Sequence, residues 1–311
     1  MVEFITSILT AAVRAGTPIL FATQGEIITE RSGILNIGIE GMLLVGAMSG
    51  FVFSRITGSP WLGVVIAGLL TMLFSLIHGI LTVCFGLNQV VSGLALNFLG
   101  IGLTSVLGSQ FVGQTARGFD SVALGPLKNI PIIGQALFNQ NALVYLSFVL
   151  TPLIAVFLYK TRTGLNIRAV GDSPVAADSA GVSVMGIRLG CVALGGTLCG
   201  IGGAYISLAY TTLWQSEMTG GKGWIAVALV IFAQWNPLKA IYGAYLFGGI
   251  TALQLTIQVQ GTTVSSHFLQ MLPYIFTVFV LACAMYRVKR KGGSSTVSVG
   301  PASLGQPYIR E

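Results

Sequence analysis

The sequence predicts an all-α protein, a polytopic membrane helix bundle with about nine transmembrane segments. Hydrophobic residues make up 54% of the 311 residues and charged residues only 8%, whereas soluble domains carry about 25% charged residues. No Asp, Glu, Lys or Arg occurs in residues 56–116 or 240–286, and each run holds two or three crossings at ~20 residues apiece. The ~10-residue alternating segments of an outer-membrane barrel do not occur in the sequence. A helical bundle is therefore the expected class.

Nine crossings fit the apolar segments best, and eight or ten stay open. They are expected at residues 4–23, 33–54, 60–85, 89–112, 142–160, 187–212, 223–235, 238–257 and 268–286. The segment 223–235 is too short to cross upright, which indicates half of a broken or re-entrant helix. Residues 1–291 form the predicted transmembrane domain, and residues 292–311, rich in Ser, Gly and Val, are expected to be a disordered cytoplasmic tail.

The basic residues predict an orientation. If the N-terminus lies outside and the C-terminus in the cytoplasm, eleven basic residues fall at the inner face and four in outer loops, as the positive-inside rule requires. The inner residues are Arg31, Lys160, Arg162, Arg168, Arg188, Lys239, Arg287, Lys289, Arg290, Lys291 and Arg310. The outer residues are Arg55, Arg117, Lys128 and Lys222. Topology thus accounts for the net charge of +7, and no nucleic-acid partner is expected.

The second span is expected to be discontinuous. Gly33, Gly38 and Gly41 interrupt its start, and Asn36 and Glu40 stand among apolar residues. A glutamate at the bilayer centre costs about 2.5–3.5 kcal/mol on insertion scales, so Glu40 should face a cavity, a partner group or the interface. Two interpretations stay open: Glu40 lines a transport pathway built on a broken helix, or it caps a helix at the level of the lipid headgroups.

Polar residues also gather around the fourth span. Asn88, Ser92 and Asn97 step by four and five residues and can share one helix face, with Gln89 beside them. Such a face needs hydrogen-bond partners in lipid, either from neighbouring helices or from a polar solute, and both interpretations stay open. His78 in the third span is interpreted as a packed or interhelical bonded group.

A water-facing stretch at residues 160–188 separates two long uncharged runs. Ser173 as N-cap and Pro174 at the first helical position predict the start of a short helix, and Gly181 predicts its end. The surrounding basic residues place this helix on the cytoplasmic side. It is expected to lie outside the bilayer, where it can receive force from a soluble partner.

No pattern of a catalytic site, a metal site or an ATP site occurs. The sequence contains no GxxxxGK[ST], HExxH or GxSxG motif. The four cysteines fall in apolar runs without CxxC spacing. We therefore expect no enzymatic activity and no cofactor bound by this chain.

The longest outer connection, residues 114–141, contains prolines and glycines that predict turns. Its PIIG element is expected to return towards the membrane as a short interfacial helix. This loop is the expected docking surface for a soluble solute-binding partner.

Four stretches carry a resemblance to a known family. They read GEIITERSGILNIGIEGMLLVGA, GLNQVVSGLALNFLGIGLT, TRTGLNIRAVGDSPVAADSAGVSV and FAQWNP. They resemble the permease subunits of bacterial ABC importers, most closely the nucleoside and simple-sugar branch of the branched-chain amino acid and ribose permease superfamily. The resemblance implies a homologous second permease, a cytoplasmic ABC ATPase that uses ATP and magnesium, and an extracellular or periplasmic solute-binding protein or lipoprotein. It also implies a multi-pass protein of the bacterial plasma membrane.

The resemblance implies that the segment GDSPVAADSAGV is a coupling helix, which sits in a groove of the ATPase. Gly164 and Gly171 are expected to give turns, and Arg168 and Asp172 to pair with the ATPase or with each other. Small residues are expected to form a smooth contact surface on this helix. The full set of expected coupling residues is Gly164, Arg168, Gly171, Asp172, Ser173, Pro174, Ala176, Ala177 and Gly181.

The resemblance also implies transport of a nucleoside, with a simple sugar as the alternative; a facilitator or channel working alone is a further alternative. Polar, uncharged ligands suit hydrogen-bonding side chains, and a base also suits an aromatic platform. The expected pathway residues are Asn36, Glu40, Asn88, Gln89, Ser92 and Asn97, with Phe98 or Trp224 as the platform.

Overall fold

The computed structural model describes residues 2–131, 133–259, 266–290 and 300–309. Among them, seven helical segments are long and apolar enough to cross a membrane. They are Glu3–Arg31, Ile39–Thr57, Pro60–Cys84, Gln89–Phe111, Ala142–Lys160, Val184–Tyr210 and Pro237–Val259. The all-α membrane class is confirmed, whereas the count of nine crossings stays a prediction.

Several of these segments combine an α-helix with a tighter or wider turn. The first half of the chain forms α1 (Val2–Arg31), α2 (Ile39–Thr57), α3 (Pro60–Gly79) with a π-helical turn at Ile80–Cys84, α4 (Gln89–Gly108) with a 3-10 turn at Ser109–Phe111, and α6 (Ala142–Lys160). The second half forms α7 (Arg162–Asp172), α8 (Pro174–Ser179), α9 (Val184–Tyr205) with a π-helical turn at Ile206–Tyr210, α10 (Lys222–Phe232), α11 (Pro237–Val259) and α12 (Ser266–Arg290).

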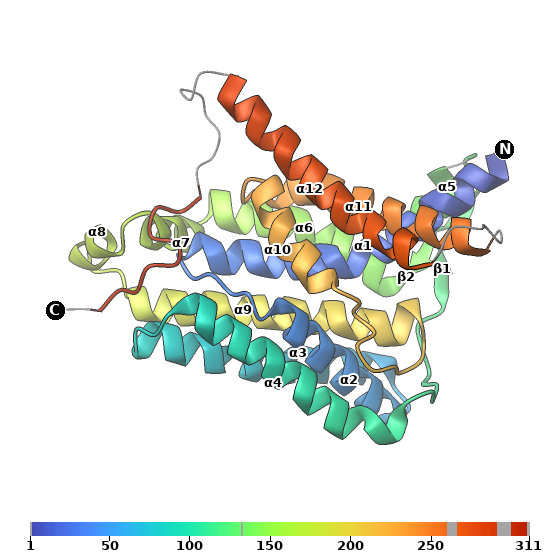
Figure 1. Ribbon diagram of the computed structural model, residues 1–311, viewed down its shortest axis with the longest axis horizontal. Coiled ribbons are helices and arrows are strands. Elements are labelled where there is room, and N and C mark those ends of the chain that lie inside the picture. Colours follow the sequence, from blue (N-terminus) through green and yellow to red (C-terminus); the bar gives the residue numbers. More distant parts are fainter. Residues whose placement is uncertain (1, 132, 260–265, 291–299, 310–311) are drawn as a thin grey trace.

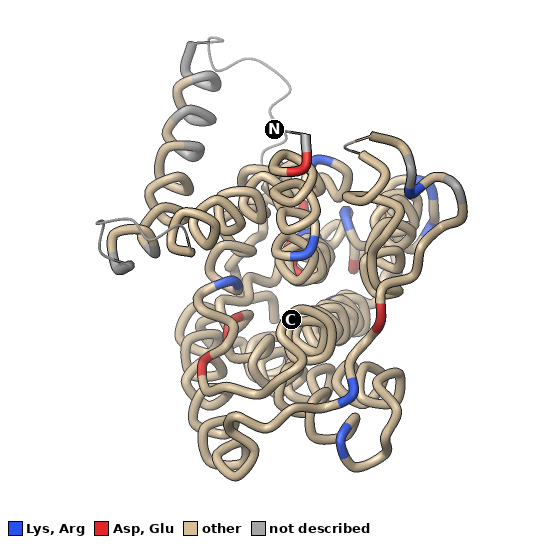
Figure 2. Tube along the Cα trace, turned by 90° about the vertical axis from the view of Figure 1, so that its right-hand side faces the viewer, with Lys and Arg blue, Asp and Glu red and all other residues tan. Residues whose placement is uncertain are grey.

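The two ends of the bundle differ in content. One end carries the N-terminus together with β1 (Ser121–Ala123), β2 (Asn139–Asn141) and α5 (Ile133–Phe138), and the other end carries α7, α8 and the C-terminus (Figure 1). Seen along the bundle from the N-terminal end, charged residues are sparse (Figure 2). The two termini lie at opposite ends of the bundle (Figure 1).

Helix α9 lies at the centre and packs against α1, α2 and α3. Its glycines allow this, because a Cβ on Gly195 would meet the backbone of Gly25, and a Cβ on Gly203 would collide with the Leu43 carbonyl. Small residues let membrane helices approach closely, which increases their dispersion contacts. Helix α2 is the most enclosed of the seven segments, with 78% of its apolar window buried.

Helix α1 is longer than predicted, which corrects the expected crossing at residues 4–23. It continues through Gln24, Glu26 and Glu30 to Arg31, and all three polar side chains are buried inside the bundle. The helix ends where Gly33 adopts a left-handed conformation with φ +90°. Residues 32–38 are then non-helical, and the continuous helix of the expected second span begins at Ile39 rather than residue 33.

The connection between α4 and α6 contains more regular structure than turns alone. β1 and β2 pair antiparallel, a 3-10 turn occupies Gly125–Asn129, and α5 overlaps the PIIG element. The Arg14 guanidinium of α1 donates a hydrogen bond to Gln140 at 3.1 Å, which ties this connection to the bundle.

The C-terminal tail corrects the expectation of disorder for residues 300–309, and residues 292–299 and 310–311 lie outside the described residues. Ser303 is buried, and its hydroxyl donates to the Gly171 carbonyl at 2.7 Å. The Gly305 amide donates to the Gly33 carbonyl at 3.3 Å. Ser- and Gly-rich composition predicts disorder when a segment has nothing to bind, but these backbone groups have partners on the bundle.

Candidate functional site

Residues 32–38 are not helical, so most of their backbone amides and carbonyls have no helical hydrogen-bond partners inside the bundle. Side chains from neighbouring helices bond to several of these groups. The Asn36 amide donates to Glu26 at 2.9 Å, and the Leu35 amide donates to Gln89 Oε1 at 2.7 Å. The Leu35 carbonyl lies 3.2 Å from His78 Nε2. Such pairing is required wherever backbone leaves helical geometry inside a membrane protein.

The polar face of α4 contributes to the same segment. Asn97 Oδ1 accepts a hydrogen bond from the Gly41 amide at 2.8 Å, and the Ser92 hydroxyl lies 3.0 Å from His78 Nδ1. His78 is therefore an interhelical bonded group, as expected. Asn97 thus bonds the start of α2, Gln89 bonds the segment before it, and Ser92 bonds His78. Contact of these side chains with a solute stays a prediction.

Glu40 lies at the junction of two helix N-termini. Its Oε1 accepts hydrogen bonds from the Thr219 hydroxyl at 2.5 Å and the Gly221 amide at 2.8 Å, and its Oε2 accepts one from the Gly223 amide at 2.6 Å. The side chain is 7% exposed. Free amides at a helix N-terminus favour a carboxylate, so this buried charge is held by the start of α10.

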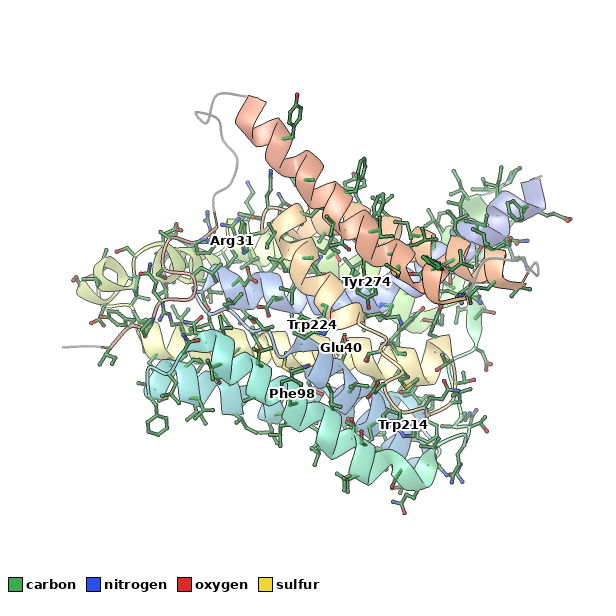
Figure 3. The ribbon with its side chains drawn as sticks, in the orientation of Figure 1. Arg31, Glu40, Phe98, Trp214, Trp224 and Tyr274 are labelled. Carbon is green, nitrogen blue, oxygen red and sulfur yellow. The ribbon has the colours of Figure 1, made fainter. Side chains whose placement is uncertain are left out.

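Helix α10 is half a membrane span. Its 11 residues rise about 16 Å at 1.5 Å per residue, against ~30 Å of hydrocarbon. The helix begins at Lys222, next to the Glu40 side chain, which lies near the middle of the long axis in Figure 3. From there it runs towards the end of the bundle that carries α7 and α8. The expected half helix at 223–235 is therefore found at Lys222–Phe232. Broken helices that meet in this way form solute sites in many transporters.

The remaining expected pathway residues lie apart from this buried junction. The Asn88 side chain caps α4 by accepting from the Val90 and Val91 amides, and it is exposed rather than on the inner polar face. Phe98 is 67% exposed on α4, and Trp224 is 39% exposed one residue after Gly223 (Figure 3). Both aromatic rings are free to contact a solute or a second subunit.

The short helix α8, at the end of the bundle that carries the C-terminus, has the expected form. Helix α8 begins at Pro174, the Ser173 hydroxyl accepts from the Ala176 amide, and Gly181 is left-handed with φ +82°. Ala177, however, is 5% exposed and packs with Val170 and Val184. The exposed residues of α8 and of the turn that follows it are Val175, Ala176, Ser179, Ala180 and Gly181, and their contact with an ATPase stays a prediction.

Gly164 and Gly171 do not form turns, which corrects that expectation. Both lie inside α7, where a Cβ would collide with the Phe157 carbonyl at Gly164 and with the Arg31 carbonyl at Gly171. Their role is close backbone approach between α7 and the bundle. In the described part of the chain no ion pair joins Arg168 to Asp172; the Arg168 guanidinium lies 5.4 Å from the centre of the Tyr159 ring.

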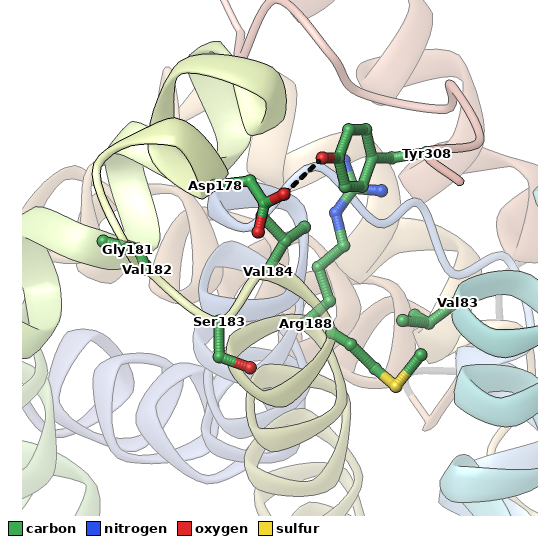
Figure 4. Close-up of a pocket in the computed structure, with 9 residues that line it drawn as sticks. Val83, Asp178, Gly181, Val182, Ser183, Val184, Arg188 and Tyr308 are labelled. Carbon is green, nitrogen blue, oxygen red and sulfur yellow. Dashed lines mark hydrogen bonds between the residues drawn. The ribbon is translucent and has the colours of Figure 1, made fainter. Parts of the chain in front are cut away.

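The C-terminal tail adds contacts that sequence reasoning missed. The buried Arg188 of α9 donates to the Ser32 carbonyl and to the Ser303 hydroxyl, both at 3.2 Å. The Tyr308 hydroxyl donates to Asp178 of α8 at 3.2 Å, beside a cavity of about 380 Å³ (Figure 4). The tail thus joins α7 and α8 to the non-helical segment before α2.

The turn between α10 and α11 forms a second cluster at this end. The Trp235 indole donates to Glu30, and the Trp235 carbonyl accepts from Arg31 at 3.3 Å and from the Tyr159 hydroxyl at 3.2 Å. Asn236 caps α11 at Pro237, as the Asn-Pro pair predicts. The QGEIITER motif carries the signal for this cluster, since two glutamates in a bundle helix require partners.

Across the described residues, no group of three or more His, Cys, Asp or Glu side chains suits a metal ion. Glu26, Gln89, Asn97 and Glu40 are buried polar side chains that bond backbone amides at helix ends and in the segment before α2.

Comparisons with known proteins agree with this geometry. The family described as branched-chain amino acid transport system / permease component matches residues 7–285. The putative glucose ABC transporter permease protein TsgC13 of Haloferax volcanii is 39% identical over 99% of both chains. The nucleoside ABC transporter permease protein NupC of Lactococcus lactis is 38% identical over 94% of both chains.

Two similar proteins come from one bacterium. The guanosine ABC transporter permease protein NupQ of Bacillus subtilis is 29% identical over 100% of this chain and 98% of its own, and NupP, with the same description, is 24% identical over 91% and 84%. No solved structure matches the chain. The match over most of the sequence confirms the resemblance, and the chain belongs to the branched-chain amino acid transport system permease family.

Proposed function

We propose that this chain is a permease subunit of an ATP-driven importer that moves a nucleoside into the cytoplasm. The observation that carries the choice of solute is the similarity to NupC and NupQ, which are named for nucleoside and guanosine transport. The Glu40 junction supports a polar pathway through the bundle, because a buried carboxylate there accepts hydrogen bonds from the first amides of the half-length helix α10.

The pathway is proposed to pass the exposed side of this junction. Trp224 follows Gly223 directly, and its partly exposed ring offers a stacking surface for a base. Phe98 offers a second aromatic surface on α4. The enclosed residues Asn36, Gln89, Ser92 and Asn97 are proposed to shape the pathway by holding the start of α2.

Transport is proposed to be driven through α7 and α8 by a separate cytoplasmic ATPase, where ATP and magnesium bind. The exposed small side chains of α8 admit close contact with a partner surface. An outer solute-binding protein would deliver the nucleoside at the end that carries β1, β2 and α5. The pair NupQ and NupP supports a second, homologous permease as the other half of the pathway.

The proposed orientation puts the N-terminus outside and α8 in the bacterial cytoplasm. A cysteine in place of the exposed Ala176 tests it. A membrane-impermeant maleimide should label this cysteine in inside-out vesicles and not in intact cells. Labelling from outside would reverse the orientation.

A sugar importer is the second candidate, because TsgC13 is named for glucose. The deciding experiment reconstitutes the complete transporter in vesicles and measures ATP-dependent uptake of guanosine, ribose and glucose. Guanosine uptake supports the proposal, and glucose uptake without nucleoside uptake refutes it. Vesicles that contain this chain alone should show no uptake; uptake there would support a facilitator instead.

A further inference from the structure

A cavity of about 340 Å³ lies beside the start of α10, between α10, α11 and α12. Its walls include Lys222, Thr251, Gln254 and Tyr274. The volume is at the small end of the ~300–1,000 Å³ range of ligand pockets, so it suits one small solute. None of these residues belongs to the polar positions expected from the sequence.

The strongest sign of a ligand is an unsatisfied amide. Gln254 is 8% exposed, and within the described residues its side chain has no hydrogen-bond partner. One helical turn further along α11, Gln258 Nε2 is buried and likewise has no partner. Buried polar groups are normally paired, and an unpaired amide inside a membrane helix costs about 1–3 kcal/mol. A polar solute in the cavity would supply the missing partner to Gln254.

The other polar groups leave capacity for a solute. Lys222 Nζ uses one donor on the Thr219 carbonyl at 3.0 Å, and an ammonium has three. The Thr251 hydroxyl donates to the Phe247 carbonyl at 3.0 Å, which leaves its oxygen free to accept. The Tyr274 hydroxyl donates to the Gly220 carbonyl at 3.2 Å, which fixes the ring at the wall.

The charge of the site favours an uncharged solute. The Lys222 ammonium is close enough to Glu40 to interact electrostatically, and Glu40 lies on the first amides of α10. One positive and one negative charge cancel, so the wall has no net charge to offset that of a phosphate group. A nucleotide would therefore enter at a large desolvation cost.

We propose that this cavity is the recognition pocket for an uncharged nucleoside, in which Gln254 reads the edge of the base and Lys222 and Thr251 bind the ribose hydroxyls. The proposal rests on the proposed function and adds the residues that select the solute. An amide presents a donor beside an acceptor, which is the pattern needed to pair with a base edge that does the same.

The test measures binding to the purified transporter complex without its receptor, because the receptor otherwise masks the permease site. Equilibrium dialysis with labelled guanosine should give a Kd about tenfold weaker for Gln254→Met, which keeps the length and removes both hydrogen-bonding groups. Thr256→Val is the matched control, since that hydroxyl bonds its own helix at the Ala252 carbonyl. An unchanged Kd for Gln254→Met, or wild-type guanosine transport without saturable binding, overturns the pocket.

Gln254→Glu keeps the shape and tests recognition separately from folding. A carboxylate accepts only, so the variant should lose affinity for adenosine more than for guanosine, whose base presents adjacent donors. Equal loss for both nucleosides, or equal binding of guanosine and its monophosphate by the wild type, contradicts the proposal. Glucose uptake without nucleoside uptake by the wild type refutes the proposed function instead, which separates the two failures.

Discussion

Replacement of Glu40 gives the sharpest test of the broken-helix junction. Glu40→Leu removes the acceptor of three hydrogen bonds, from the Thr219 hydroxyl and the Gly221 and Gly223 amides. Glu40→Gln keeps one carbonyl oxygen for two of these donors and turns an amide towards the third. Glu217 is exposed and lies in the loop before α10 that also contains Thr219 and Gly221, so Glu217→Gln is the control.

The loss of unfolding free energy in the Glu40 variants can be estimated from these hydrogen bonds. Each buried donor left without an acceptor costs about 1–3 kcal/mol, so three donors at Glu40→Leu give at least about 3 kcal/mol, taken at the low end because the burial of a charge is also removed. Glu40→Gln should cost about half as much. With a shift on the order of 2 °C per kcal/mol for a chain of this size, the unfolding midpoint should fall by about 6 °C and about 3 °C.

The assay is thermal unfolding of the purified complex in detergent, read by intrinsic fluorescence at a fixed scan rate. Glu217→Gln should leave the midpoint unchanged, because its carboxylate faces solvent. If Glu40→Leu is as stable as this control, the carboxylate does not hold the start of α10, and the junction as described is wrong. ATP-dependent uptake measured on the same samples should fall in the same order as stability.

Three further predictions concern the ends of the bundle and the start of α2. Asn97→Leu should leave the Gly41 amide without an acceptor and reduce uptake several-fold with the complex intact. Asn97→Asp keeps an acceptor and should retain most uptake. Equal uptake by both variants would show that the bond to the Gly41 amide does not matter for transport. Val175→Arg, on the exposed face of α8, should abolish co-purification with the ATPase, whereas Val122→Arg at the opposite end should not; intact assembly of the first variant would exclude α8 as the contact. Ser303→Val should lower the unfolding midpoint by about 2–4 °C, because the Gly171 carbonyl and the Arg188 guanidinium lose a hydrogen-bond partner worth about 1–2 kcal/mol. An unchanged midpoint would show that Ser303 does not hold the tail on the bundle.

The parts of the fold that composition dictates could be predicted from the sequence. Long uncharged runs must be helical in a membrane, since only helices and closed barrels satisfy the backbone there. The cap at Ser173 and Pro174 and the turn at Asn236 and Pro237 were readable because their signals are local. A non-helical segment precedes α2 at Gly33 and Gly38, whereas Gly41, also expected to interrupt the helix, lies inside α2. The discontinuous second span therefore stays a prediction.

Features that depend on distant partners could not be predicted. Nothing local shows that Ala177 faces inward, because its burial depends on how α8 packs against α7 and the start of α9. The approach of Gly171 to Arg31 likewise depends on how α7 packs against the end of α1. The composition of residues 300–309 predicts disorder, but Ser303 of this segment bonds the Gly171 carbonyl, which is more than a hundred residues away in the sequence. Lys222 and Gln254 were missed for the same reason, since a cavity between three helices has no signature in any one of them.

The contacts along α10 connect the end of the bundle that carries α7 and α8 to the candidate site. Gly171 of α7 packs on the Arg31 carbonyl, Arg31 binds the Trp235 carbonyl, and Trp235 follows the end of α10. The opposite end of α10 holds Glu40 and lines the cavity through Lys222. Helix α10 contains no proline, the residue at which sharp helix kinks are most common. We therefore expect any displacement of α7 and α8 to reach the solute pocket as movement of a rigid α10, about 16 Å away along its axis.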